Sequence, residues 1–507
     1  MDRRVFLTVS AAALLAACTP EKSRRERPRT LLRRSADAYR PRVHYSPARG
    51  NLADPNGLVY LAGEYHLFFQ HDGRWAHAAS KNRLHWRDLG VAIDREGENQ
   101  ALSGSAVVDR RNTSGLVDGS DGLVAVFTST DGGEAQSVAS SSDRGRTFTR
   151  YDHNPVLRHD GGGPDFRDPK VFWHADSDSW VMVVSSGDHV SIFGSPDLIE
   201  WSHLSDFGQG QGLHSAVWEC PDLFSLPLDG HQDATRWVMH VSVGASEATD
   251  GSTSQYFVGT FDGTTFVNEN APDDVMIADF GQDFYAAQTW SDDHQDDKVW
   301  IGWLGNWRYP YGAPTGTWHG AMSLPRTLSL ETRSGRPRVV QQVIDTAPLR
   351  RKSTAVRDFA VEGLHELPFH HTAYELEATV EWDQLDEVAV QLMRGDRDFV
   401  SVGFDARNGT VFVDRSASGS HGVADRDGND VTFGRRSEAV DDPAMTQLRI
   451  HAIVDRSSIE VFFDNGRHVA SVVVFTDEGN DGIAWQTTGG RATVRDCRVT
   501  ELAAIWS

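Results

Sequence analysis

The chain has 507 residues, of which 49 are Lys or Arg and 72 are Asp or Glu, and its formal net charge is −23. This length suggests two or three domains rather than one small core. The charged fraction of 24% and the hydrophobic fraction of 39% are ordinary for a globular protein, which excludes global disorder. The negative charge argues against a nucleic-acid partner, because phosphate binding needs a basic footprint.

Only five residues of the chain are lysines, so nearly all of the positive charge comes from arginine. Two explanations of this acidic, lysine-poor composition stay open. One is adaptation to high salt, since a strongly charged surface keeps a protein soluble when screening is severe. The other is a GC-rich genome, which favours Arg over Lys.

The first eighteen residues are typical of an export signal. Arg3 and Arg4 form a twin-arginine pair, and the apolar run Val9 to Ala17 is too short to span a bilayer. The run ends in a lipobox-like sequence that predicts lipidation of Cys18, with a plain secretory signal as the alternative. Residues 19–38 read as a polar tether. We therefore expect an exported protein that is lipid-anchored at the cell surface or extracellular.

Short apolar or aromatic runs follow, each bounded by Gly, Asp, Asn or Pro, and helical periodicity is nearly absent. Residues 57–69, 170–184 and 223–241 each read as two strands joined by a tight turn. The sequence therefore predicts an all-β protein.

A repeat runs through the first three hundred residues. An Asn or Asp stands four or five residues before an aromatic residue at Trp86, Phe148, Trp201 and Phe266, with spacings of 62, 53 and 65 residues. Hairpin units of this size with a recurring turn and aromatic residue are typical of β-propeller blades. Four copies, with strand-like sequence continuing to about residue 330, predict a five-bladed propeller over residues 39–335.

The composition changes at the polar segment 331–337, which we interpret as the domain boundary. Beyond it, runs such as 376–382, 448–454 and 459–463 alternate between apolar and polar residues. Alternation with period two and frequent turns predicts a β-sandwich over residues 345–507. Cys220 and Cys497 are too far apart in sequence to indicate a disulfide framework or a metal site, and we interpret them as buried apolar residues.

Three carboxylates stand in unusual local contexts. Asp54, Asp168 and Glu219 each precede a predicted hairpin, and each has a proline one or two residues later. Proline fixes the backbone and removes a donor, which would hold each side chain in a defined direction. Because the innermost strands of propeller blades converge on one channel, we expect the three carboxylates to share a pocket.

These contexts and several other short motifs resemble glycoside hydrolase family 32, the family of invertases, inulinases and levanases. The resemblance covers residues 42 to 507, and the motifs come in the family's order. They are His44-Tyr45-Ser46-Pro47, Asp54-Pro55-Asn56-Gly57, Trp75-Ala76-His77, Ser103-Gly104-Ser105, Phe166-Arg167-Asp168-Pro169, Trp218-Glu219-Cys220-Pro221, Asp283-Phe284-Tyr285, Ser323-Leu324-Pro325-Arg326 and Asp455-Arg456-Ser457-Ser458-Ile459-Glu460.

The resemblance implies a five-bladed propeller followed by a β-sandwich, and a retaining mechanism on fructosyl linkages. It assigns Asp54 as the nucleophile, Glu219 as the general acid/base and Asp168 as the stabiliser of the transition state. No metal and no organic cofactor is implied. Candidate substrate-binding residues are Asn56, Gln70, Trp75, Ser103, Arg167, Trp218 and Asp283, although a tryptophan in a β-protein is more often simply packed.

Two departures from the family pattern bear on specificity. Ala53 stands where the family has an asparagine that contacts the sugar, and the loop after Gln70 is shorter than is common. A shortened rim would open the pocket to longer fructans or change the access of water.

We therefore expect an exported retaining hydrolase that releases fructose from sucrose, inulin or levan. The alternatives are a fructosyltransferase or difructose-anhydride-forming enzyme, a pentosidase of the neighbouring five-bladed class, and a non-catalytic carbohydrate-binding surface protein. The expected partner is a fructose-containing saccharide, with the membrane reached only through Cys18. The sequence does not indicate an oligomeric state.

Overall fold

The computed structural model describes residues 38–118, 121–159, 165–293, 297–419, 422–477 and 479–506. The predicted signal, its Cys18 and almost all of the tether lie outside these residues. Within the described ranges the regular structure consists of strands and two short 3-10 helices, Ala347–Leu349 and Asp464–Gly466, which confirms the all-β prediction. None of the described helices is long and apolar enough to cross a membrane.

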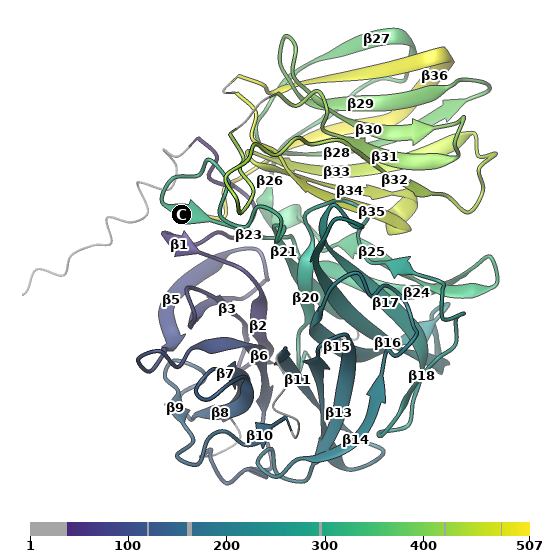
Figure 1. Cartoon of the computed structure of the whole chain (residues 1–507). Helices are drawn as coiled ribbons and strands as arrows, with labels where there is room; N and C mark the ends of the chain where they lie inside the picture. Colours follow the sequence, from purple (N-terminus) through teal and green to yellow (C-terminus); the bar gives the residue numbers. More distant parts are fainter. Residues whose placement is uncertain are drawn as a thin grey trace, which may run out of the picture.

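The first part of the chain forms sheets of antiparallel strands that follow one another in sequence (Figure 1). The first sheet holds β2 (Pro55–Leu61), β3 (Glu64–Gln70), β4 (Trp75–Ser80) and β5 (Trp86–Ile93). The second holds β6 (Ala101–Val108), β7 (Leu123–Ser129), β8 (Ala135–Ser141), β9 (Thr149–Arg150) and β10 (Leu157–Arg158). The third holds β11 (Phe166–His174), β12 (Ser179–Ser186), β13 (His189–Ser195) and β14 (Ser202–Phe207).

A fourth and a fifth group of strands complete this part. The fourth holds β15 (Trp218–Leu228), β16 (His231–Ser246), β17 (Gly251–Phe261), β18 (Phe266–Asn268) and β19 (Met276–Ile277). The fifth holds β20 (Tyr285–Thr289), β21 (Lys298–Leu304), β23 (Ala321–Met322), β24 (Arg326–Arg333) and β25 (Arg336–Val343). One parallel pairing, Leu228 with Leu330, joins the two groups into one sheet. Near the chain start, β1 (Gly50–Asn51) pairs with β22 (Trp318–His319).

The first strands of the five groups lie next to one another in a closed ring. β2 contacts β6, β6 contacts β11, β11 contacts β15, β15 contacts β20, and β20 contacts β2. These five strands therefore surround one common centre.

The aromatic repeat has a local structural cause. Each aromatic residue stands at or directly before the start of an outer strand, β5, β9, β14 or β18. The side-chain oxygen of the preceding Asn82, Asp143, Asp197 or Asp262 accepts backbone N–H groups two to four residues later. These Asx turns reverse the chain before the outer strand, which is why an Asn or Asp recurs at a fixed distance from an aromatic residue.

The second part of the chain is one extended antiparallel sheet system (Figure 1). Its strands are β26 (Arg350–Ala355), β27 (Phe359–His370), β28 (Tyr374–Trp382), β29 (Glu387–Arg394), β30 (Val400–Asp405), β31 (Thr410–Asp414), β32 (Arg435–Ala439), β33 (Gln447–Asp455), β34 (Ser458–Phe463), β35 (His468–Val473) and β36 (Gly482–Leu502). On β28, Leu376, Ala378 and Val380 enter the core, and the intervening residues stay partly exposed. This is the period-two alternation expected from the sequence.

The boundary between the two parts differs from the one we inferred at 331–337. This polar segment is the turn of the β24–β25 hairpin, in which Arg333 pairs with Arg336 and Arg326 pairs with Val343. An exposed hairpin turn and a linker have the same polar composition, and the first part therefore extends to Val343.

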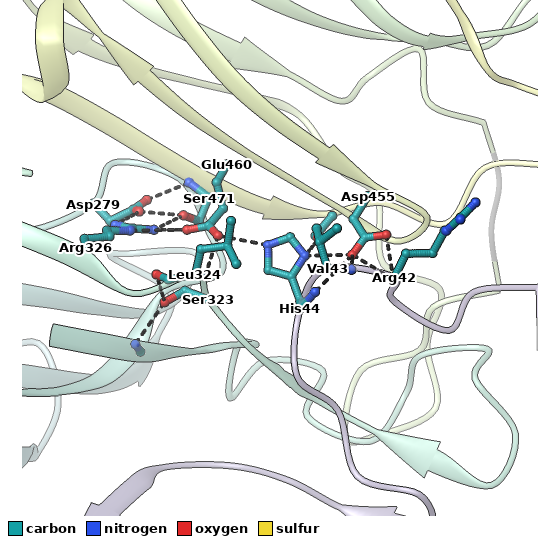
Figure 2. A network of polar contacts seen from close by, with 12 residues as sticks. Arg42, Val43, His44, Asp279, Ser323, Leu324, Arg326, Asp455, Glu460 and Ser471 are labelled. Carbon is teal, nitrogen blue, oxygen red and sulfur yellow. Dashed lines mark hydrogen bonds and ion pairs between the residues drawn. The ribbon is translucent and has the colours of Figure 1, made fainter. Parts of the chain in front are cut away.

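A buried network of charges fastens the two parts together (Figure 2). His44 donates through Nδ1 to Asp455 and through Nε2 to Glu460, both over 2.9 Å. Arg326 donates to Glu460 over 2.6 Å and to Asp279 over 3.0 Å. These five side chains are completely buried. Although burial favours the neutral imidazole, the two carboxylates raise the pKa of His44 to about 9, so it is a cation at neutral pH.

Candidate active site

The three predicted carboxylates lie at the same end of three of the five first strands, β2, β11 and β15. Asp54 directly precedes β2, Asp168 is the third residue of β11, and Glu219 is the second residue of β15. In each strand the pairing register shifts at the acid or just after it, between Asn56 and Val59, Arg167 and Lys170, and Glu219 and Asp222. Such a bulge leaves a residue unpaired and redirects the side chains beside it.

Backbone strain and proline placement fit these bulges. Asp168 has φ of +67° and Cys220 has φ of +49°, a left-handed conformation that non-glycine residues rarely adopt. Pro169 and Pro221 follow directly, and at a bulge their missing N–H costs no ladder hydrogen bond. The local sequence therefore produces the irregularity that turns each carboxylate toward the centre of the ring.

Each carboxylate is held by specific donors. Ser103 Oγ donates to Asp54 Oδ2 over 2.7 Å, and the backbone N–H of Cys220 donates to Asp168 Oδ2 over 3.0 Å. Arg167 donates to Glu219 Oε1 through Nε and Nη2, over 3.0 and 2.9 Å. Within the described part of the chain, the buried Oδ1 of Asp54 has no hydrogen-bond partner. Ser103 and Arg167 thus belong to the cluster.

Burial and mutual repulsion change the acidity of two of these groups. Desolvation raises the pKa of Asp54 to about 6. The Ser103 hydrogen bond opposes this rise in part, and the charge of Glu219 adds to it. Desolvation raises the pKa of Asp168 to about 7. The positive charge of Arg167 opposes this rise, and the negative charges of Glu219 and Asp54 add to it. Desolvation also raises the pKa of Cys220 well above its ordinary value, so this residue is a neutral thiol. The cluster therefore takes up protons near neutral pH.

Four other predicted contact residues lie in different surroundings. Asn56 is buried on β2, and Gln70 donates to the carbonyl of Ala101 over 3.0 Å. Trp75 and Trp218 are completely buried, and their indole N–H groups donate to the carbonyls of Leu102 and Leu213. Neither indole presents a free face in this structure, which favours the packing role for both.

Asp283 lies at the junction of the two parts of the chain. Tyr309 donates to its Oδ1 over 2.6 Å, while Arg415 and the backbone N–H of Val473 donate to its Oδ2 over 3.1 and 2.8 Å. Since Arg415 and Val473 belong to the second part, the contacts of Asp283 are those of a domain-joining residue.

Tyr285, which sequence reasoning did not select, belongs to the cluster. Its hydroxyl donates to Glu219 Oε2, on the side opposite Arg167. Desolvation and the nearby charge of Glu219 raise the pKa of this phenol well above its ordinary value, so it remains a donor. It lies in the same motif as Asp283, two residues further along, and that motif was the available signal.

The rim of the site is built by both parts of the chain. Tyr311 is 55% exposed, and desolvation together with the charge of Asp54 raises its pKa. In the second part, Ala424 donates its N–H to the carbonyl of Gly312, and Arg426 extends its guanidinium to 5.3 Å from the ring of Trp307. A cation from the second part thus stands at the edge of the cluster.

Comparisons with known proteins agree with the arrangement. The family model of the glycosyl hydrolases family 32 N-terminal domain matches residues 44–342, and that of the family 32 C-terminal domain matches residues 345–501. The chain belongs to glycoside hydrolase family 32. It is therefore a glycoside hydrolase, as the motifs predicted.

Individual family 32 proteins align over most of the chain. A levanase of Bacillus subtilis is 40% identical over 92% of this chain and 71% of its own length. The crystal structure of an exo-inulinase from Aspergillus awamori has a TM-score of 0.84 at 31% identity, covering 92% of this chain and 99% of that one. A fructofuranosidase from Schwanniomyces occidentalis complexed with fructosylnystose has a TM-score of 0.82 at 27% identity, covering 92% and 98%.

Proposed function

We propose that this protein is a retaining β-fructofuranosidase that hydrolyses sucrose or fructans through a covalent fructosyl-enzyme. The observation that carries the proposal is the cluster of three carboxylates on three first strands of the closed ring, with burial raising the pKa of two of them. A retaining glycosidase needs a pair of carboxyl groups, one ionised for attack and one protonated for the leaving oxygen. The levanase, exo-inulinase and fructofuranosidase relatives support the fructosyl substrate.

The roles follow from how each group is held. Asp54, oriented by the Ser103 hydroxyl, is the proposed nucleophile that attacks the anomeric carbon. Glu219 is the proposed acid/base, and it stands between Arg167 and the Tyr285 hydroxyl, which fix its orientation. It gives its proton to the leaving oxygen and later takes one from water.

Asp168 is the proposed stabiliser of the oxocarbenium-like transition state. The Cys220 N–H fixes one of its oxygens, and its own N–H donates to Thr128 Oγ1 over 3.0 Å. A carboxylate held this rigidly in a buried site interacts strongly with positive charge that develops on the sugar ring. Burial, together with the repulsion among the three groups, keeps a proton in the cluster near neutral pH. Acid catalysis requires that this proton lies on Glu219 when the bond breaks.

We further propose that the five groups of strands form a five-bladed propeller and that the second part is a β-sandwich. The closed ring of contacts from β2 through β20 supports five blades. The propeller then spans residues 39–343 and the sandwich residues 345–507. The twin-arginine signal and the lipid anchor at Cys18 rest on the sequence alone, and mass spectrometry of the mature protein tests both.

Polymeric fructans are the proposed preferred substrates. Ala53 is small, Tyr311 is exposed, and Arg426 projects from the second part, so the rim is both open and able to contact sugar units beyond the first. Aromatic faces and arginine donors at the mouth of a pocket suit repeated hydroxylated rings.

The test is a substrate panel of sucrose, inulin and levan, with fructose release and product size as readouts. We expect turnover of at least one substrate and a loss of at least ~1,000-fold in kcat for Asp54→Ala and for Glu219→Gln. Asp72→Ala, at an exposed aspartate near the rim, is the matched control and should retain activity. Full activity of Asp54→Ala would contradict the nucleophile assignment, whereas new oligosaccharides or cyclic dimers in place of fructose would identify a transferase.

A further inference from the structure

A second cavity lies at the opposite end of the ring of first strands. Its volume is about 480 Å³, within the range of small-molecule sites. β11 carries Asp168 near its start and Phe172 and Trp173 near its end, and it is the latter two that line this cavity. In the same way β15 carries Glu219 near its start and contributes Phe224 to the cavity. The two sites therefore occupy opposite ends of one channel.

A buried ion pair separates the cavity from the catalytic cluster. Lys170 Nζ donates to Asp222 Oδ2 over 3.1 Å and to the carbonyl of Thr289 over 2.8 Å. The N–H of Thr289 donates to the same Asp222 oxygen over 2.6 Å. These contacts join β11, β15 and β20 across the centre, and both charged side chains are almost completely buried. A ligand in the cavity would thus have no direct path to the carboxylates.

Aromatic side chains form part of the cavity wall. Phe172, Trp173 and Trp237 are only half-buried, and the rings of Phe172 and Trp237 lie 5.6 Å apart. The guanidinium of Arg111 stands 3.9 Å from the centre of the Trp173 ring. Half-buried aromatic rings beside a cation offer apolar contact and charge recognition to one ligand.

The charge of the lining is opposite to that of the protein. Four cations line the cavity, and two of them, Lys170 and Lys298, are among the five lysines of a chain whose net charge is −23. The others are Arg110 and Arg111. Within the described residues, no hydrogen bond or ion pair engages the Lys298 ammonium group.

The acidic residues of the lining are already engaged. Both oxygens of Asp109 accept hydrogen bonds from Thr113 and Ser114. Asp292 accepts from the N–H of Val108 over 3.1 Å and from Arg110 over 3.4 Å. Arg111 also donates to the exposed Asp178 over 3.2 Å. The lining carboxylates therefore have local donors, Arg110 and Arg111 each have a carboxylate partner, and the Lys298 ammonium group is available to a ligand.

We propose that this cavity is a second ligand site that takes a small organic anion with an apolar face. Lys298 and Arg111 bind the anionic group, and the Trp173 and Trp237 rings pack against the rest of the ligand. A phosphorylated sugar and an aromatic carboxylate share this chemistry. Because the Lys170–Asp222 pair closes the channel, binding here leaves substrate binding at the carboxylates unchanged.

Isothermal titration calorimetry on the full chain tests the proposal, with glucose 6-phosphate and benzoate as probes and with glucose and inorganic phosphate as controls. We expect at least one of the two probes to bind at least ~10-fold more tightly than both controls, since charge and apolar contact act together. Which probe binds identifies the class of anion. Lack of binding by both probes would overturn the proposal.

Variants locate the bound probe. Lys298→Gln and, separately, Arg111→Gln should each weaken binding at least ~10-fold, because each removes one charge-assisted contact. Lys352→Gln, at an exposed lysine of the second part, is the matched control and should bind as the unmodified protein does. Saturating probe should leave the KM for the substrate unchanged. A competitive rise in KM, or binding unaffected by both variants, would overturn the proposal.

Discussion

Neutralising Asp168 should stabilise the protein while it removes activity. The pKa of this carboxyl in the folded protein is about 7, against an ordinary value of 3.8, chiefly because of burial. A carboxyl whose pKa is raised by folding binds its proton more tightly in the folded state. It therefore lowers stability progressively as the pH rises from about 4 to about 7, and the penalty is constant above that. Asp168→Asn removes the penalty and keeps an oxygen that can accept from the Cys220 N–H.

The size of the effect follows from the same pKa. A difference of about 3 pH units corresponds to about 4 kcal/mol at pH 8. Part of this is repulsion from Asp54 and Glu219, which relax when their neighbour is neutral. We therefore expect Asp168→Asn to raise the free energy of unfolding by about 2–4 kcal/mol at pH 8 and by about 1 kcal/mol at pH 4.5.

Urea denaturation followed by tryptophan fluorescence at the two pH values measures this difference. Asp222→Asn is the matched control, since Asp222 is equally buried but is paired with Lys170. Its neutralisation leaves a buried ammonium group unpaired and should cost about 3–5 kcal/mol. The two substitutions thus have opposite predicted signs. If Asp168→Asn were less stable than the unmodified protein at pH 8, this would refute the inference that the buried, ionised Asp168 lowers the stability of the folded protein.

Three further predictions concern pH and the rim. The acid limb of kcat/KM should have its midpoint between about pH 6 and about pH 7, because a protonated Asp54 does not attack and a protonated Asp168 does not stabilise positive charge on the sugar; a rate that is flat down to pH 4 would contradict this. The stabilisation from the His44 cation should be complete below about pH 6.5 and lost as the pH rises through about 9, and His44→Gln should abolish this pH dependence of unfolding in urea. Arg426→Ala should raise KM severalfold for inulin or levan but not for sucrose, with the exposed Arg491→Ala as control; equal effects on all substrates would exclude a rim contact.

Much of the site was predictable because it is encoded locally. Asp54, Asp168 and Glu219 each sit beside a proline at a bulge, so the sequence motif and the backbone irregularity are one feature. The aromatic repeat was equally local, since an Asx turn needs only a few consecutive residues. The order of the motifs along the chain then made the resemblance to a known family recognisable.

Contacts between distant segments were not predictable in the same way. Asp283 meets Arg415 across 132 residues of sequence, and nothing near Asp283 indicates that partner. Trp75 and Trp218 belong to the quoted motifs, but a motif does not reveal whether its ring is enclosed by neighbouring residues or faces the site. The β24–β25 turn has the composition of a linker, and only the pairing of Arg326 with Val343 shows that it is a hairpin.

The buried network at the junction makes the two parts of the chain mutually dependent. His44 lies ten residues before Asp54, and its two carboxylate partners, Asp455 and Glu460, come from the far end of the chain. Separating the parts would take Asp455 and Glu460 away from the cations His44 and Arg326. The two cations would then lose these carboxylate partners. The second part therefore acts as an internal scaffold for the segment that leads into the site. We expect the chain to unfold as a single cooperative unit, and fusion partners to be tolerated better than truncations after Val343.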